Sequence, residues 1–176
     1  FEARYDALGS GARPVAAPPG SALMDELDVA DLESEEAHGY ALGSAWDHEN
    51  EAWFGSAPEL TLPDEANADP EARPSPRPLL ADGGRVNRAR DTFRMKLPAG
   101  RRAVLVMRVA AEEAVTLSVG VAAREVGPVD VPLGTWVERA LELASDLSSA
   151  PGDVTIEVTE KSGLRFASFH YWLYAR

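Results

Sequence analysis

The stretch Asp153-Val-Thr-Ile-Glu-Val-Thr159 places Val154, Ile156 and Val158 on one face of an extended chain. Polar side chains occupy the alternate positions, which is the period-two pattern of a strand with one buried and one solvated face. A Pro-Gly pair at residues 151–152 precedes the stretch and is a turn signal. The sequence therefore predicts a β-strand here, with one face against a hydrophobic core.

The same kind of pattern recurs through the C-terminal half of the chain. Alternating or β-branched apolar segments, separated by Gly, Pro and Asp, occupy residues 93–97, 102–109, 115–121, 136–143 and 166–174. Short strands at this spacing favour an antiparallel sandwich or barrel over βαβ units. We therefore predict an all-β protein with at least five antiparallel strands between residues 93 and 174. Its core should include Trp136, Val154, Ile156 and Val158.

The N-terminal half carries weaker signals. Residues 27–31 and 38–42 are each expected to form a strand, joined by an acidic turn at 33–36, and to pair into the same sandwich as the C-terminal strand. Six prolines between residues 58 and 78 predict a long irregular loop. Residues 1–21 are rich in Gly, Pro and Ala, which favours a linker or extended arm. The domain prediction is this arm followed by a single β-sandwich over residues 22–176.

Composition excludes several classes of function. The chain has 176 residues, with 29 acidic against 17 basic side chains and a net charge of −12. This charge argues against a nucleic-acid partner, because phosphate binding depends on Lys and Arg. The absence of cysteine excludes disulfides, thiolate metal sites and Cys nucleophiles. No apolar run approaches the roughly 20 residues of a membrane span, so no membrane insertion is expected.

Residues 93–174 resemble the jelly-roll sandwiches of the galactose-binding-domain-like superfamily, which includes many carbohydrate-binding modules. The resembling pieces are residues 103–109, 116–121, 131–136, with Trp136 opening a strand, and 151–158, entered through a Gly turn. The resemblance implies an antiparallel jelly-roll β-sandwich, a saccharide partner and, in some members, a structural calcium ion. The superfamily's ligand loops have no match here, so the ligand does not follow from the resemblance.

A second likeness rests on the acidic residues 25–40 and the terminal Phe-His-Tyr-Trp-Leu-Tyr at 169–174. These loosely resemble extracytoplasmic domains of bacterial membrane-bound sugar transferases and lipoproteins. This likeness implies an extracytoplasmic location, periplasmic or secreted, and a cell-envelope protein as an alternative partner. The chain begins at Phe1, so we expect a processed protein or a piece of a longer one, in which an upstream segment would supply any anchor.

The terminal strand supplies the candidate ligand site. Period two places Phe166, Ser168, His170, Trp172 and Tyr174 on one face. Aromatic rings with polar tips suit sugars, whose C–H faces stack on a ring while their hydroxyls reach polar partners. We therefore expect His170, Trp172 and Tyr174, joined by Trp46 or Trp53, to contact a saccharide. The alternative is a central strand buried on both faces, and burial of Trp172 and Tyr174 would favour that structural role.

Two acidic segments are candidates for binding a metal ion. Asp47, Glu49 and Asn50 lie between Trp46 and Trp53 and offer the oxygen ligands that Ca²⁺ prefers, although their spacing fits no EF-hand. The alternative is a solvated turn anchored by the two Trp side chains. The acidic run at residues 25–36 is expected to be a solvated sheet edge protected by its charges, with a structural calcium site as the alternative.

Catalytic motifs are absent from the sequence. There is no Gly-x-Ser-x-Gly elbow and no phosphate-binding glycine loop. The prediction is therefore a non-catalytic extracytoplasmic β-sandwich that binds glycans or serves as an accessory domain. The alternatives are a structural or protein-interaction domain of a cell-envelope assembly, and a small metal-dependent hydrolase.

Overall fold

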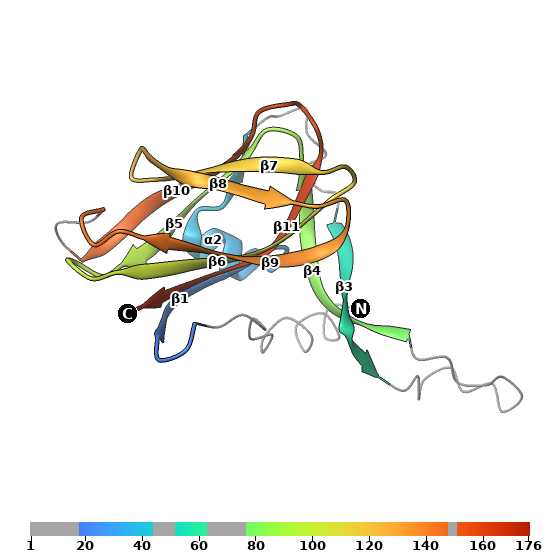
Figure 1. Ribbon diagram of the computed structural model, residues 1–176, viewed down its shortest axis with the longest axis horizontal. Helices are drawn as coiled ribbons and strands as arrows, with labels where there is room; N and C mark the ends of the chain where they lie inside the picture. Colours follow the sequence, from blue (N-terminus) through green and yellow to red (C-terminus); the bar gives the residue numbers. More distant parts are fainter. Residues whose placement is uncertain (1–17, 44–51, 63–76, 148–150) are drawn as a thin grey trace, which may run out of the picture.

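The computed structural model describes residues 18–43, 52–62, 77–147 and 151–176. Eleven strands and one helix lie within these ranges, and Figure 1 shows the strands in two facing layers. The elements are β1 (Ala22–Asp28), α2 (Leu32–His38), β2 (Ala41–Leu42), β3 (Ala52–Leu62), β4 (Arg77–Asn87), β5 (Arg90–Leu97), β6 (Ala103–Ala111), β7 (Val115–Val121), β8 (Arg124–Val131), β9 (Gly134–Leu143), β10 (Gly152–Glu160) and β11 (Phe166–Ala175).

The strands form two antiparallel sheets. The six-stranded sheet has the order β3-β4-β11-β6-β9, and β1 also pairs with β11. The five-stranded sheet has the order β2-β5-β10-β7-β8. Strand β11 is central: β6 pairs along one side of it, while β4 pairs with its first residues and β1 with its last ones on the other side. The all-β prediction is confirmed.

The main core lies between the two sheets. Phe93, Leu105, Leu117 and Tyr171 are fully buried there, and one in every two residues of β5 and β7 points inward. Ile156 and Val158 are fully buried, as predicted, and Val154 packs against this core as a half-buried residue. Trp136 lies in β9, and its side chain is outside the described part of the structure.

The acidic segment before residue 40 differs from the prediction. The strand expected at its start is present as β1, which pairs with β11 as expected. The expected acidic turn is instead helix α2: the Asp31 side chain accepts hydrogen bonds from the first amides, and Gly39 ends the helix with a φ of 58°. Only Ala41 and Leu42 of the second expected strand are extended. Two capping residues thus outweigh the weak strand signal.

The predicted arm and Pro-rich loop can be compared with the structure only where their residues lie in the described ranges. Residues 58–62 and 77–78, expected in the Pro-rich loop, belong to β3 and β4, and residues 63–76 lie outside the described ranges. The expected arm at 1–21 is outside them up to residue 17. No helix among the described residues is long and apolar enough to cross a membrane.

Candidate functional site

A β-bulge in β11 decides which of its side chains face outward. The register between β11 and β6 shifts between Ser168 and His170. Before the shift, Ser168 faces the sandwich interior, where its hydroxyl bonds to Tyr171 and Asp91. After the shift, Trp172 points to the opposite side, into a cluster apart from the main core. The extra residue at a bulge reverses the alternation, so Phe166 and Ser168 do not share a face with His170, contrary to the period-two prediction.

His170 and Trp172 form a closed stack on the outer face of the six-stranded sheet. Their rings are 4.1 Å apart and inclined by 10°. Glu26 of β1 accepts hydrogen bonds from both, at 2.8 Å from His170 Nε2 and 3.1 Å from Trp172 Nε1. Both rings are fully buried, and Tyr174 is 7% exposed. The expected exposed platform is therefore not present: the carboxylate of β1 caps the ring edges, and the strand is buried on both faces.

A buried ion pair completes this face. The Arg108 guanidinium donates to Glu138 Oε1 at 2.8 and 3.2 Å, and its central carbon lies 4.8 Å from the centroid of the Trp172 ring. A cation over an indole face is attracted by the ring quadrupole. The Arg108 side chain is 2% exposed and that of Glu138 is 11% exposed, so the pair is largely desolvated.

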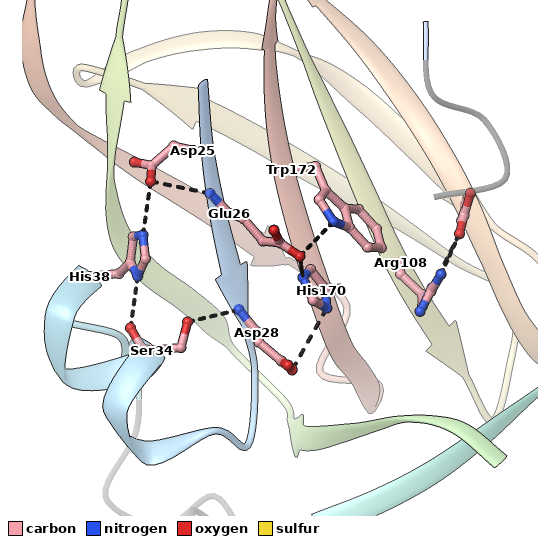
Figure 2. Close-up of polar contacts among 9 residues, drawn as sticks. Asp25, Glu26, Asp28, Ser34, His38, Arg108, His170 and Trp172 are labelled. Carbon is pink, nitrogen blue, oxygen red and sulfur yellow. Dashed lines mark hydrogen bonds and ion pairs between the residues drawn. The ribbon is translucent and has the colours of Figure 1, made fainter. Parts of the chain in front are cut away.

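We call Glu26, Asp28, Arg108, Glu138, His170 and Trp172 the outer-face cluster; its members lie on β1, β6, β9 and β11, and Figure 2 shows those on β1, β6 and β11. Among the three carboxylates of this cluster, Glu26 is the most exposed at 39%, against 17% for Asp28 and 11% for Glu138. Carboxylate oxygens held by buried donors therefore form the solvent-facing part of this cluster. Such oxygens accept hydrogen bonds, and they can receive the hydroxyls of a ligand.

Strand β1 is held from its other side by α2. His38 Nε2 lies 3.3 Å from Asp25 Oδ1, and the Ser34 hydroxyl accepts the Asp28 amide at 2.9 Å. The hydrogen bond to Asp25 raises the pKa of His38 above its usual value, although burial acts to lower it. For Asp25, burial acts to raise the pKa, but hydrogen bonds from His38 and the Lys96 amide outweigh it and hold the pKa below its usual value.

A second polar group is enclosed between the sheets. The buried Asp91 carboxylate accepts hydrogen bonds from the hydroxyls of Tyr40 at 2.9 Å, Tyr171 at 2.7 Å, and Ser168. Burial raises the pKa of Asp91 to about 6, against the lowering effect of these hydrogen bonds. Burial also raises the pKa values of Tyr40 and Tyr171. The sequence did not point to this group, because Asp91 is 77 residues from Ser168 and has no local motif.

The acidic run at 25–36 is used for internal contacts in the described structure. Asp31 caps α2, and Glu35 receives Arg85 through two hydrogen bonds of 2.5 and 2.8 Å. No group of three His, Asp or Glu side chains among the described residues is placed to hold a metal ion. The candidates Trp46, Asp47, Glu49 and Asn50 lie outside those residues, as does the side chain of Trp53 in β3. These remain predictions.

Comparison with known proteins identifies the fold. No protein-family model and no curated protein matches the chain. Among solved structures it is similar to the CBM22-1–GH10 modules of xylanase 10B from Clostridium thermocellum, complexed with xylohexaose, with 12% identity and a TM-score of 0.53. That alignment covers 88% of this chain and 28% of the xylanase chain.

Further similar structures are carbohydrate-binding modules. The module CBM6cm-2 of Cellvibrio mixtus lichenase 5A, in complex with cellotriose, has 13% identity and a TM-score of 0.43, covering 88% of this chain and 98% of the module. A family 35 module from Clostridium thermocellum has 13% identity and a TM-score of 0.39, covering 70% and 97%. The similarity to the xylanase modules, at a TM-score of 0.53, supports the jelly-roll β-sandwich fold that the two antiparallel sheets form.

Proposed function

We propose that this chain is a non-catalytic carbohydrate-binding domain whose binding surface is the outer face of the six-stranded sheet. The observation that carries the proposal is the outer-face cluster, which fixes two carboxylates from β1 and β9 over buried aromatic and cationic groups. The fold supports it, since the similar xylanase modules are complexed with xylohexaose. Fold likeness alone does not assign a function, so the site must be tested directly.

The geometry gives Glu26 and Glu138 the role of hydrogen-bond acceptors for sugar hydroxyls. Each carboxylate is already oriented by buried donors, His170 and Trp172 for one and Arg108 for the other. A preoriented acceptor loses little conformational entropy on binding, and hydrogen bonds to a charged group are stronger than neutral ones. In this proposal Trp172 orients Glu26 and does not stack on the sugar, because its ring is buried.

Charge narrows the class of saccharide. The Glu26 side chain is 39% exposed, and those of Asp28 and Glu138 are 17% and 11% exposed, in a chain of net charge −12. Carboxylates at the site repel the carboxylate or sulfate groups of uronates and sulfated sugars, and this repulsion weakens the binding of acidic saccharides. We therefore expect neutral oligosaccharides to bind better than acidic ones of equal length.

Titration calorimetry tests the proposal with xylohexaose and cellotriose as neutral probes and an oligogalacturonate as the acidic one. Glu26→Gln and Glu138→Gln remove charge at the site while keeping an acceptor oxygen, and each should weaken binding roughly tenfold or more. The matched control is Glu125→Gln on β8 of the other sheet, where Glu125 is exposed and 3.8 Å from Lys161. Circular dichroism first establishes that each variant is folded.

The proposal is wrong if a broad glycan panel gives no binding, or if both site variants bind as well as the unmodified chain. Burial of His170 and Trp172 favours a second candidate, a structural or protein-interaction domain. In that case Glu26→Gln should lower the free energy of unfolding while no glycan binds at all.

We also propose that the domain is an accessory part of a larger extracytoplasmic or cell-envelope protein. Support comes from the xylanase, of whose chain the alignment covers only 28%, so the similar fold occurs there within a longer protein. Immunoblotting of fractionated source cells tests this location. Recovery in the cytoplasmic fraction alone would contradict it.

A further inference from the structure

Strand β1 is an acidic strand that lies between two histidines. Its side chains Asp25, Glu26 and Asp28 carry three carboxylates within four residues. Figure 2 shows His38 of α2 on one side of the strand and His170 of β11 on the other. Two of the chain's three histidines thus contact the same seven-residue strand.

The ring of His38 is placed for its doubly protonated form. Its Nδ1 lies 2.7 Å from the Ser34 carbonyl oxygen and its Nε2 lies 3.3 Å from Asp25 Oδ1. The Ser34 carbonyl oxygen can accept a hydrogen bond but not donate one, and the same holds for the Asp25 carboxyl when it is ionised. A neutral imidazole has one N–H, whereas the imidazolium has two. Only the charged ring therefore donates to both neighbours.

His170 has a similar arrangement on the opposite side of β1. Its Nε2 is 2.8 Å from Glu26 Oε1, and its Nδ1 is 3.7 Å from Asp28 Oδ1. Both ring nitrogens face carboxylate oxygens, and the ring is fully buried. This surrounding is complementary to a positive charge on the ring.

We propose that β1 is a proton-operated latch: protonated His38 and His170 hold it against β11 and α2, and loss of their protons loosens it from the sheet. The latch itself rests on the contacts of β1. Its effect on glycan binding rests additionally on the proposed function, because Glu26 and Asp28 belong to both.

Other charged groups surround the latch. From β5, the Lys96 amide donates to Asp25 Oδ2 at 2.7 Å, and the charge of Lys96 opposes a charge on His38. Arg94, also on β5, places its guanidinium beside Gly39: a Cβ added to Gly39 would lie 3.2 Å from a guanidinium nitrogen of Arg94. From β6, Arg108 is paired with Glu138 of β9, and from β4, Arg85 is paired with Glu35 of α2.

The direction of the pH effect follows from the His38–Asp25 pair. The pKa of His38 is raised above 6.5 in the folded protein, so its contribution to stability is complete below pH 6.5 and is lost as pH rises through the raised pKa. The pKa of Asp25 is lowered below 3.8, so its contribution is present above pH 3.8 and is lost as pH falls through the lowered pKa. The latch is therefore closed in mildly acidic solution and loosens as the solution becomes alkaline.

Amide hydrogen exchange followed by NMR tests the latch on the whole chain. Protection factors, which correct for the intrinsic pH dependence of exchange, are compared for β1 and for β10 at about pH 5.5 and about pH 8.5, on either side of the ordinary histidine pKa. We expect protection in β1 to fall about tenfold relative to β10, because the hydrogen bonds that the charged rings donate to β1 are lost at the higher pH.

Variants assign the effect to the two histidines. His38→Gln and His170→Gln should each flatten the pH dependence of β1 protection, whereas His48→Gln, a matched loss of the third histidine, should leave it unchanged. If His170→Gln fails to fold, His38→Gln carries the test, since His38 is partly exposed at 14%. Protection in β1 that is independent of pH, or an unchanged pH dependence in His38→Gln, would overturn the latch.

A titration with xylohexaose at the same two pH values separates the latch from the proposed function. Weaker binding at the higher pH, with the difference lost in His38→Gln, is the result expected if both hold. If β1 protection depends on pH but no glycan binds, the latch stands and the proposed function fails. Equal affinity at both pH values would overturn the coupling between the latch and the binding surface.

Discussion

The two sheets differ in how far their outer faces are buried. In the five-stranded sheet, β7 and β10 alternate between buried and more exposed residues, so Thr116, Thr155 and Glu157 point to the solvent side. In the six-stranded sheet, β6 and β11 are buried at every position. A half-solvated sheet explains the first pattern, whereas the second requires a covered outer face. The outer face of the six-stranded sheet is therefore the face on which polar groups are held by buried partners.

The outer face of the six-stranded sheet behaves as a second, partly polar core. Trp172 and Tyr174 pack with Val104 and Val106 there, apart from the main core. Charged groups tolerate such burial only when they are paired and hydrogen-bonded. On the five-stranded sheet, by contrast, charged side chains remain half in water and no such pairing is required.

Replacing Trp172 by Ala should give the largest loss of stability. Truncating a buried Trp costs about 3–5 kcal/mol of the free energy of unfolding, and this one also releases Glu26, whose carboxylate it bonds. Urea unfolding measures the loss. The control is Thr155→Ala on the solvent side of β10, which should change stability by no more than about 0.5 kcal/mol. Equal small effects for the two variants would remove the distinction between the sheets.

Asp91→Asn examines the interior between the two sheets. The pKa of Asp91 is raised from 3.8 to about 6, so its contribution to stability is complete below pH 3.8 and is lost as pH rises through about 6. A shift of this size corresponds to on the order of 3 kcal/mol. The free energy of unfolding of the unmodified chain, measured by urea unfolding between these pH values, should therefore fall relative to that of Asp91→Asn. Parallel pH profiles for the two proteins would contradict the assignment.

Gly84→Ala tests the close approach of β4 to β11. A Cβ at Gly84 would lie 2.5 Å from the Ser168 carbonyl oxygen and 2.8 Å from the Phe169 ring, so the backbone must shift. Such overpacking costs about 1–3 kcal/mol. The matched variant is Gly120→Ala in β7, where the nearest atoms are 3.9 Å from the new Cβ. Thermal unfolding should show a loss for the first and no comparable loss for the second.

Much of the fold could be predicted from the sequence, because period-two patterns are local. The alternation of Val154, Ile156 and Val158 with polar residues predicts a half-buried strand without information from any other segment. Helix α2, which Asp31 and Gly39 cap, has only seven residues, too few to give a periodic apolar stripe in the sequence. Local sequence patterns thus predicted the strands but not the helix.

The site depended on contacts between distant residues. The bulge between Ser168 and His170 reverses the facing of β11, and Ser168 and Tyr171 beside it bond to Asp91, which is 77 and 80 residues away. Glu26 is 144 residues from His170. No period in the terminal strand contains these partners, so the sequence named His170 and Trp172 as candidates and left their burial on both faces as an alternative.

Glu157→Gln should have the smallest effect and sharpens the contrast between the outer faces. Glu157 accepts from Arg90 Nη1 at 3.0 Å on the five-stranded sheet, with the two side chains 45% and 49% exposed. An exposed ion pair contributes about 0–1 kcal/mol, and salt near 1 M screens it within about 3 Å. Urea unfolding with and without added salt should therefore show a slight loss that salt abolishes. The same exchange at Glu138, whose partner Arg108 is buried, should cost more and resist salt, because little water reaches that pair. Equal responses to salt at the two positions would mean that the outer face of the six-stranded sheet is as solvated as that of the other.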